Sequence, residues 1–320
     1  MDDAPTPSFT KTLYRAIFVS PHLDDAVFSC GGEIARLSSQ GPVLVINIFT
    51  RYLSDVKIRG VVLNESRYEE EADAAKLLGF ESRNLGELDV TFRRNPYQKL
   101  GNIFRPPVEE DLQWLPELRQ KLFGILSELD FQQIYVPLGV GWHVDHILTH
   151  HVFDTWAETG KLLYYEDTPY CCIPHATRFR LNDIAIYPQL PGDSSLVPIP
   201  NVKAWWQTSM GYANTALMRN LKPWIVRKSA LPVVSYYLWR LMSTHRRKAA
   251  TAPKRLLHPC VIPIDDYLQQ KVDAMLLYNS QFKEFFSSRQ DGVNTLSAYA
   301  KTISHSKTAL ERYWTPTPIH

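Results

Sequence analysis

An imidazole and two carboxylates lie close together near the start of the chain. The segment SPHLDDA, residues 20–26, places His22, Asp24 and Asp25 between a short apolar run and an amphipathic one. Neutral imidazole and carboxylate oxygens are ordinary ligands of Zn²⁺. One carboxylate can bind the ion while its neighbour accepts a proton. The alternative interpretation is that both acids only cap the helix that follows, because carboxylates interact favourably with helix N-termini.

A second group of the same kind follows a later apolar run. The segment PLGVGWHVDH, residues 137–146, adds His143, Asp145 and His146. Because the carboxyl ends of parallel strands lie at one edge of a sheet, the two loops are expected to meet. Histidines and acids held together need a counter-charge, and a divalent cation supplies one. The pair of segments therefore predicts a metal site.

The elements that must position these loops alternate between strands and helices. The predicted strands are short apolar runs: Ala16–Ser20, Val43–Thr50, Leu85–Val90, Ile134–Leu138 and Leu162–Tyr165. The predicted helices are amphipathic: Ala26–Gln40, Glu65–Leu78, Glu109–Leu129, one from about Asp145, and Ile264–Phe286. This alternation predicts an α/β, Rossmann-like layered fold with a mainly parallel sheet flanked by helices.

The second half of the chain differs in composition from the first. Residues 166–225 are rich in proline, asparagine and aromatic side chains, and residues 222–258 are basic. We predict a tail, an α/β core and a C-terminal helical and irregular extension that covers the cleft: residues 1–14, 15–165 and 166–320. Since no linker-like stretch separates the last two, they are expected to form a single domain, 15–320.

Bulk composition argues against several classes of protein. A formal net charge of +2 over 320 residues does not indicate a nucleic-acid binder. The four cysteines form no C-x-x-C pair, and the N-terminus has no apolar signal segment, so we expect reduced thiols and a cytoplasmic protein. The apolar stretch Ser229–Trp239 is shorter than the roughly 20 residues of a spanning helix, so the chain is not expected to be transmembrane. Nothing in the sequence indicates the oligomeric state.

A basic, aromatic stretch within residues 224–255 has two interpretations. It combines aromatic with basic side chains: Trp224, Tyr236, Tyr237, Trp239, Arg246, Arg247 and Lys248. This combination is typical of a peripheral contact with anionic lipid. The other interpretation is a packed helix followed by a solvated basic tail.

The two loop segments together resemble the LmbE-like family, also called the PIG-L family after the de-N-acetylase of N-acetylglucosaminyl-phosphatidylinositol. Two further segments support the resemblance: RYEEEADAAKLLG at 67–79, and Tyr278-x-Ser280-Gln281. The chain departs from the usual Pro-His-Pro-Asp-Asp-Glu at Leu23 and Ala26. Neither position supplies a ligand, so these departures concern the backbone and the substrate rather than the metal.

The resemblance implies a zinc-dependent de-N-acetylase, which hydrolyses the amide of an N-acetylated amino sugar or glycoconjugate. His22, Asp25 and His146 match the metal ligands. Fe²⁺ also suits two histidines and an aspartate. Asp24 matches the general base, and His143 the residue that stabilises the oxyanion or protonates the leaving amine.

Three more residues are candidates for the site. The resemblance implies that Asp145 orients a histidine from behind the metal. Arg67 is expected either to contact substrate hydroxyls or to pair with Glu70 along its helix. Glu166, with Asp167 after it, is expected either to bind sugar hydroxyls or to begin a solvated loop.

Other catalytic arrangements fit the sequence less well. His146 and His150 stand four apart, but the residues between them lack the glutamate of an H-E-x-x-H peptidase. Cys30 falls inside a predicted helix, where a free cysteine is usually part of the core. The rival function is a non-catalytic metal- or sugar-binding α/β module. The sequence lacks a G-x-G-x-x-G turn, and a binding module would leave the clustering of histidine and aspartate unexplained.

Overall fold

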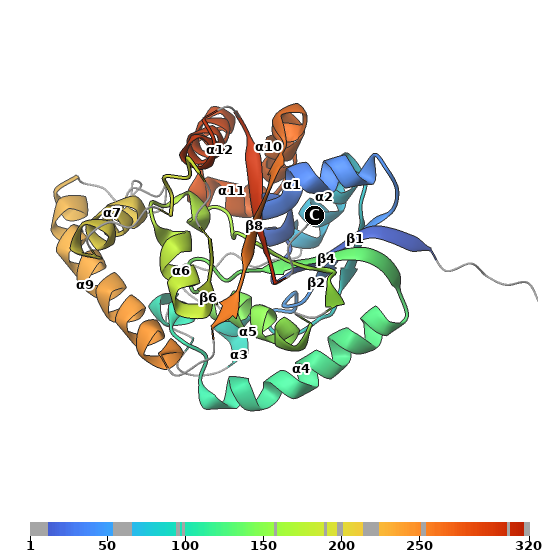
Figure 1. The fold of residues 1–320 in the computed structure, drawn as a ribbon, viewed down its shortest axis with the longest axis horizontal. Helices are drawn as coiled ribbons and strands as arrows, with labels where there is room; N and C mark the ends of the chain where they lie inside the picture. The colour runs from blue at the N-terminus through green and yellow to red at the C-terminus, as the bar shows by residue number, and fades with distance from the viewer. Residues whose placement is uncertain are drawn as a thin grey trace, which may run out of the picture.

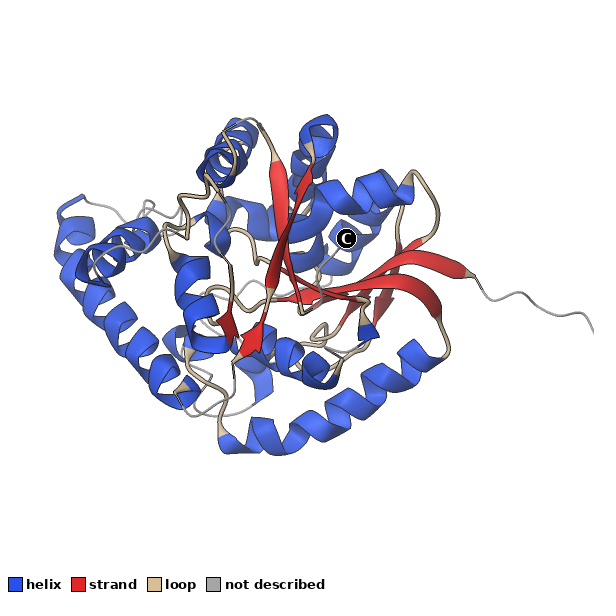
Figure 2. Ribbon diagram, viewed as in Figure 1, coloured by secondary structure: helices blue, strands red, loops and turns tan. Residues whose placement is uncertain are grey.

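Buried aliphatic and aromatic runs form the central sheet of the protein. The computed structural model describes residues 12–53, 66–93, 97, 100–156, 159–188, 191–196, 201–213, 224–250, 254–305 and 308–316. Within these residues the main sheet has seven strands in the order β3-β2-β1-β4-β5-β9-β8. The strands are β1 (Leu13–Ser20), β2 (Val43–Asn47), β3 (Glu81–Asn84), β4 (Asp130–Pro137), β5 (Leu162–Tyr165), β8 (His258–Pro263) and β9 (Leu310–Thr315). The first five pair in parallel, β9 pairs antiparallel to β5, and β8 pairs antiparallel to β9 (Figure 2).

Helices flank both faces of this sheet. In the first half they are α1 (Asp25–Ser38), α2 (Ser66–Leu78), α3 (Val90–Arg93), α4 (Glu109–Ser127) and α5 (Val144–Val152). In the second half they are α6 (Ala176–Ile184), α7 (Asn201–Ala213), α9 (Trp224–Ala249), α10 (Leu268–Leu277), α11 (Asn279–Phe285) and α12 (Arg289–Ile303). Two short strands, β6 (Ala185–Ile186) and β7 (Arg255–Leu256), pair with each other in a separate small sheet. These elements confirm the predicted α/β class, with its mainly parallel sheet and C-terminal helices.

Alternating residues of each strand supply two separate cores. Ile17 and Val19 of β1 pack with α4 and α5, whereas Ala16 and Phe18 pack with α1, α2 and α10. In the view of Figure 1, the first group of helices lies below the sheet and the second above it. Fully burying a side chain such as Phe18 stabilises the fold by about 1.5–3 kcal/mol. The sheet is therefore held from both faces, as continuous apolar strands require.

The strand order reverses at the centre of the sheet. β1 pairs with β2 on one side and with β4 on the other, so the connections after β1 and after β4 lead away in opposite directions. Phe18 lies opposite Tyr135 in the register, and their rings stack with centroids 4.4 Å apart. Such a switch point opens a crevice at the carboxyl ends of the two strands. Both motif loops begin there.

Several predicted boundaries were wrong. Leu85–Val90 is not a strand: the polar segment Glu81–Asn84 forms the edge strand β3, and Val90 begins α3. The predicted helix Ile264–Phe286 is divided at Tyr278, whose ψ of 61° separates α10 from α11. Of the predicted tail, 1–14, residues 1–11 lie outside the described residues and β1 begins at Leu13. Glu65, the predicted start of α2, also lies outside them.

The C-terminal half contributes strands as well as the expected helical cover. β9 is buried along its whole length although it carries Glu311 and Arg312. Glu311 forms an ion pair with Lys271 of α10, and Arg312 with Glu166. The four cysteines are free thiols. In the part of the chain that the structure describes, no helix is long and apolar enough to cross a membrane.

Candidate metal centre

The loop after β1 is built by its own polar groups. The Ser20 hydroxyl accepts a hydrogen bond from the Ala26 amide at 3.0 Å and donates one to the His22 carbonyl at 2.5 Å. The His22 amide donates to Oδ2 of Asp25 at 2.9 Å. Asp24 occupies the N-cap position of α1, but its side chain makes no capping hydrogen bond. The expectation that the Asp24 side chain caps the helix by a hydrogen bond is therefore wrong.

The loop after β4 depends on backbone conformations that glycine favours. Gly139 has a φ of +84° and Gly141 a φ of +92°. Oδ2 of Asp167 accepts hydrogen bonds from the amides of Gly139 at 2.8 Å and Val140 at 2.7 Å. A carboxylate from the end of β5 thus fixes the loop that leads to His143.

Substituting Gly141 tests how tightly this loop is packed. A Cβ at this position would lie 2.5 Å from Cγ of Tyr170. We expect Gly141→Ala to lower the free energy of unfolding by about 2–4 kcal/mol, because overpacking adds to the cost of a left-handed residue. Gly160→Ala is the matched control, because its φ is +68° and its Cβ would meet nothing within 4 Å. Urea denaturation of both variants measures the difference, and equal losses would show that the Tyr170 contact is unimportant.

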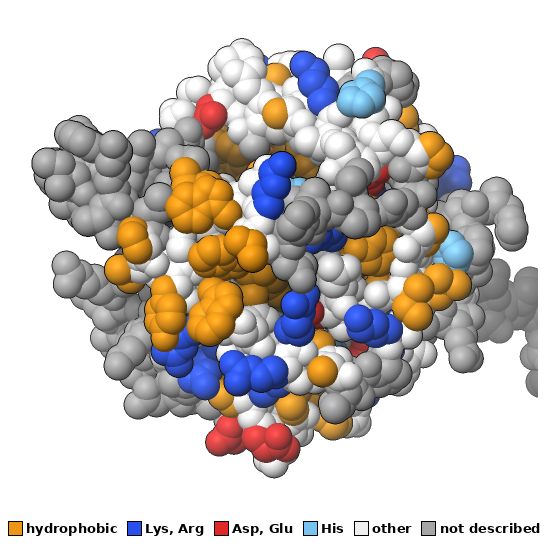
Figure 3. Space-filling view, turned by 60° about the vertical axis from the view of Figure 1, so that its left-hand side comes forward, with side chains coloured by type: hydrophobic (Ala, Val, Ile, Leu, Met, Phe, Trp, Pro, Cys, Tyr) orange, Lys and Arg blue, Asp and Glu red, His pale blue; other side chains and the backbone are white. Residues whose placement is uncertain are grey.

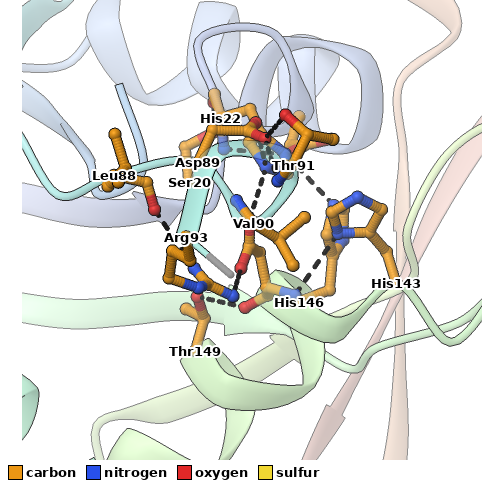
Figure 4. Close-up of polar contacts among 12 residues, drawn as sticks. Ser20, His22, Leu88, Asp89, Val90, Thr91, Arg93, His143, His146 and Thr149 are labelled. Carbon is orange, nitrogen blue, oxygen red and sulfur yellow. Dashed lines mark hydrogen bonds and ion pairs between the residues drawn. The ribbon is translucent and has the colours of Figure 1, made fainter. Parts of the chain in front are cut away.

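Donor atoms from the two loops converge on Asp25. Its Oδ2 lies 2.9 Å from Nδ1 of His22 and 3.2 Å from Nε2 of His146. Ligand atoms of His22, His143 and His146 also lie within 4.8 Å of one another. Figure 4 shows His22 on one side of this centre and His143 and His146 approaching from the other loop. The sequence motifs are therefore brought together as the topology predicts.

The remaining nitrogen of each of two histidines faces a carboxylate. Nε2 of His22 lies 3.1 Å from Oδ2 of Asp145 and 3.5 Å from Oδ2 of Asp89. Nδ1 of His146 lies 2.6 Å from Oδ1 of Asp167. Histidines that bind metals usually donate their other N–H in this way, which fixes the tautomer and leaves the first nitrogen free to ligate. This pattern identifies Nδ1 of His22 and Nε2 of His146 as the available donors.

His143 has a different environment. It is the N-cap residue of α5, and its Nδ1 accepts a hydrogen bond from the Asp145 amide at 3.3 Å. The neutral ring therefore carries its proton on Nε2. Burial, followed by the charge of His22, holds the pKa of His143 well below its usual value. A neutral Nε2–H is a hydrogen-bond donor rather than a metal ligand.

Two of the acids at the site are paired with arginine. Asp24 accepts a hydrogen bond from Nη2 of Arg67 at 2.7 Å. Asp145 accepts one from Nη2 of Arg93 at 2.5 Å. Burial raises the pKa of Asp24 to about 6 against the opposing effect of Arg67. Arg93, labelled in Figure 4, is a partner that the sequence analysis did not identify.

The other acids at the site form their ion pairs with histidine. Within the described residues, the ion pairs of Asp25, Asp89 and Asp167 are with His22 or His146. Burial alone would lower the pKa of His146, but Asp25 and Asp167 outweigh it and raise the pKa to about 10. The site thus has a surplus of negative charge that protons on the histidines would otherwise balance. A divalent cation fits both this surplus and the donor set of two imidazoles and a carboxylate.

The two supporting segments of the sequence lie against each other. Glu70 of α2 accepts hydrogen bonds from the amide and hydroxyl of Ser280, at 3.0 and 2.7 Å. Glu71 accepts one from the Tyr278 hydroxyl at 2.5 Å. The predicted helical pair of Arg67 with Glu70 is therefore wrong, because Arg67 turns to Asp24 instead. This contact places Arg67 next to the metal centre, where contact with substrate hydroxyls stays a prediction.

The side chains of Glu166 and Asp167 have different hydrogen-bond partners. Glu166 accepts hydrogen bonds from Nε of Arg312 at 2.6 Å and from the Trp314 indole at 2.7 Å, in a buried network. Its predicted role as a substrate contact has no support from this placement. Neither acid begins a solvated loop, since they are 4% and 1% exposed. Asp167, which the sequence analysis treated only as a neighbour, is the one that reaches the metal centre.

Known proteins are similar to this chain in sequence or in fold. Residues 17–157 match the family described as PIG-L, GlcNAc-PI de-N-acetylase. The 2'-N-acetylparomamine deacetylase of Streptomyces fradiae is 31% identical over 164 residues, which make up 49% of this chain and 57% of that protein. The chain thus matches little more than half the length of this curated relative.

Solved structures with a similar fold extend over nearly the whole chain. The A40926 pseudoaglycone deacetylase Dbv21 has a TM-score of 0.58 at 18% identity, covering 94% of this chain and 96% of that one. The zinc-inhibited form of teicoplanin deacetylase Orf2 has a TM-score of 0.59 at 18% identity, covering 94% and 97%. At such identities the likeness establishes the fold. The sequence match to the PIG-L family falls on residues 17–157, which carry both loops of the metal centre.

Proposed function

We propose that this protein is a metal-dependent de-N-acetylase. It hydrolyses the amide of an N-acetylated amino sugar or glycoconjugate to acetate and a free amine. The observation that carries the proposal is the position of the Asp25 carboxylate between nitrogens of His22 and His146, both of which are backed by further carboxylates. The name of the Streptomyces fradiae relative, an N-acetyl deacetylase, supports the reaction class.

His22, Asp25 and His146 are the proposed ligands of the metal. We propose Zn²⁺ as the ion, with Fe²⁺ as the alternative that the same donor set accepts. When bound, such an ion lowers the pKa of a water molecule and polarises the amide carbonyl. His143 is excluded from the ligand set by its tautomer, since a protonated Nε2 has no lone pair to offer.

Asp24 and His143 are the proposed catalytic residues. Arg67 binds Oδ1 of Asp24, and within the described residues Oδ2 makes no hydrogen bond, which leaves it for the attacking water. Asp24 accepts the proton of that water as its oxygen bonds to the carbonyl carbon. Nε2–H of His143 donates to the carbonyl oxygen as it gains negative charge. The C–N bond then breaks, and the nitrogen leaves with the proton held by Asp24.

Asp145 and Asp167 are proposed to position the ligands. Asp167→Asn is expected to weaken metal affinity by about 10–100-fold, because an amide is a weaker acceptor for the N–H of His146. Competition with a metallochromic chelator measures the affinity. Asp154→Asn is the control, since Asp154 contacts His151 by a similar hydrogen bond away from the centre. An unchanged affinity in Asp167→Asn would contradict the proposed ligand role of His146.

The function is tested by metal content and amine release together. Purified protein is expected to contain about one Zn²⁺ or Fe²⁺ per chain, as a site of three protein ligands predicts. It is also expected to release amine from at least one member of a panel of N-acetylated sugars, aminoglycosides and glycolipids. Removing the metal with a chelator should abolish release, and adding Zn²⁺ should restore it. A protein that binds metal and sugars but releases no amine across the panel would be the non-catalytic binding module instead.

A further inference from the structure

One long segment of the chain has no acidic residue. Residues 194–264 contain no aspartate or glutamate, but they contain eleven lysines and arginines. The basic residues are Lys203, Arg219, Lys222, Arg227, Lys228, Arg240, Arg246, Arg247, Lys248, Lys254 and Arg255. Because the whole chain has a formal net charge of +2, the remaining residues carry −9. The near-neutral total therefore conceals a strongly basic segment, which includes α7 and α9.

Aromatic side chains on α7 and α9 are exposed among these basic residues. Trp206 is 48% exposed, Tyr236 58% and Trp239 52%. The rings of Tyr236 and Trp239 stack with centroids 6.0 Å apart, which keeps both on the outer face of α9. Figure 3 shows hydrophobic side chains gathered on this side of the molecule, with Lys and Arg side chains next to them. A soluble protein rarely exposes a contiguous patch of this kind without a partner for it.

The same aromatic side chains line a hollow between the two helices. The cavity has a volume of about 770 Å³. Its walls include Phe179, Trp205, Trp206, Tyr236 and Trp239, and Arg246 is part of its lining. Apolar walls with one cation suit a ligand that has a long apolar part and a negatively charged end.

The inner face of α9 packs against the loop that carries His143. Leu241 packs in one cluster with Trp142, which lies next to His143 in the loop after β4. The ring of His245 stacks on Trp142 with centroids 5.9 Å apart, and His245 Nε2 bonds to the carbonyl of Phe104 at 3.0 Å. The exposed aromatic face is thus the outer side of a helix whose inner side covers the catalytic loop.

We propose that the outer face of α7 and α9 binds the surface of an anionic phospholipid bilayer. Trp206, Tyr236 and Trp239 enter the interface between head groups and acyl chains, which is where tryptophan and tyrosine side chains are enriched. Exposed basic residues of the two helices, such as Lys203, Arg240 and Arg246, interact with the lipid phosphates. The cavity receives the end of one acyl chain. Charge complementarity favours this occupant, because acidic residues are absent from the whole of 194–264.

The proposal concerns a surface and does not rest on deacetylase activity. Within the described residues no helix can span a membrane, so the contact is peripheral and reversible. Peripheral binding of this kind grows with buried apolar area and with attraction to anionic lipid, and it weakens as salt is added. A measurement of membrane binding also distinguishes between the two interpretations of the basic, aromatic stretch, because a packed helix with a solvated tail predicts no membrane binding.

Co-sedimentation of the full chain with lipid vesicles tests the proposal. We expect binding to vesicles of mixed phosphatidylcholine and phosphatidylglycerol to be at least about tenfold tighter than to phosphatidylcholine alone, and to fall at high salt. The double variant Trp206→Ser/Trp239→Ser should lose binding to both vesicle types. Arg246→Gln/Arg247→Gln should lose only the preference for anionic lipid.

Matched controls lie on α4, which is not part of the proposed face. Leu112→Ser removes a side chain of 39% exposure from α4, and Lys121→Gln removes an exposed charge from the same helix. Both are expected to bind vesicles as the unmodified protein does. The proposal is overturned if the unmodified protein does not sediment with anionic vesicles, or if the tryptophan variant binds as well as Leu112→Ser. It is also overturned if Trp239→Ser converts a dimer to a monomer in size-exclusion chromatography, which would assign the face to a second copy of the chain.

Discussion

Asp24→Asn is expected to lower kcat by about 10²–10⁴-fold on any N-acetylated substrate that the protein hydrolyses, with the metal content unchanged. Asparagine is nearly isosteric with aspartate, so its oxygen can still accept the hydrogen bond from Arg67. It cannot accept a proton from water, however. The proposed base is therefore removed while the loop keeps its shape. Steady-state amine release and metal analysis of the same sample measure the two effects.

The neighbouring acid supplies the matched control. Asp25→Asn is expected to lose metal and activity together, because Asp25 lies between His22 and His146. The two variants thus separate base from ligand on adjacent residues. If Asp24→Asn retained full activity, another group would have to accept the proton. If instead it lost metal as Asp25→Asn does, the assignment of the two acids would be reversed.

The position of the site was predictable because it depends on topology. Apolar runs before residues 20–26 and 137–146 predicted two buried strands, and parallel neighbours place their carboxyl ends together. The structure adds that β1 and β4 are adjacent at the switch point, where no other strand separates their loops. The spacing of histidine and aspartate within each loop gave the candidate donors. Neither conclusion needed information on distant parts of the chain.

The residues that support the donors were harder to find. Asp167 follows β5 at the same edge of the sheet as the two motif loops, which is a signal that the sequence does carry. Deciding between Glu166 and Asp167 requires knowing which way each side chain turns after the strand ends. Asp89 and Arg93 follow β3, a polar strand that the hydrophobic pattern does not indicate. The pattern predicted a strand at Leu85–Val90 instead. Their contacts with His22 and Asp145 arise from tertiary structure alone.

Two of the strands that the sequence analysis missed, β3 and β9, could not be predicted from local hydrophobicity. β3 has the sequence ESRN and is exposed throughout, so its only signal is the ladder it forms with β2. β9 has the sequence LERYWT and is fully buried, with two charges that a core strand would normally exclude. Those charges are neutralised by partners far away in the sequence. A pattern of local hydrophobicity cannot reveal such partners.

The pair that buries one of these charges should contribute strongly to stability. Nζ of Lys271 lies 2.7 Å from Oε1 of Glu311 and donates to the carbonyl of Ser29 at 3.0 Å. Glu311 also accepts hydrogen bonds from the amides of Gly32 and Glu33 in α1, both at 2.9 Å. The pair thereby ties α10 and β9 to the first helix. Lys271→Met is expected to lower the free energy of unfolding by about 3–5 kcal/mol, because it leaves the Glu311 carboxylate buried without a cation.

A surface pair of similar geometry shows why burial decides the size of this effect. Nζ of Lys121 lies 2.9 Å from Glu87, but the lysine side chain is 44% exposed, so Lys121→Met is expected to cost only about 0.2–1 kcal/mol. The double variant Lys271→Met/Glu311→Gln should be more stable than Lys271→Met alone, since it buries no unpaired charge. Urea denaturation of the variants provides the comparison. A loss in Lys271→Met no larger than in Lys121→Met would mean that Glu311 is neutral in the folded protein, and that hydrogen bonds to α1 rather than charge hold β9 in place.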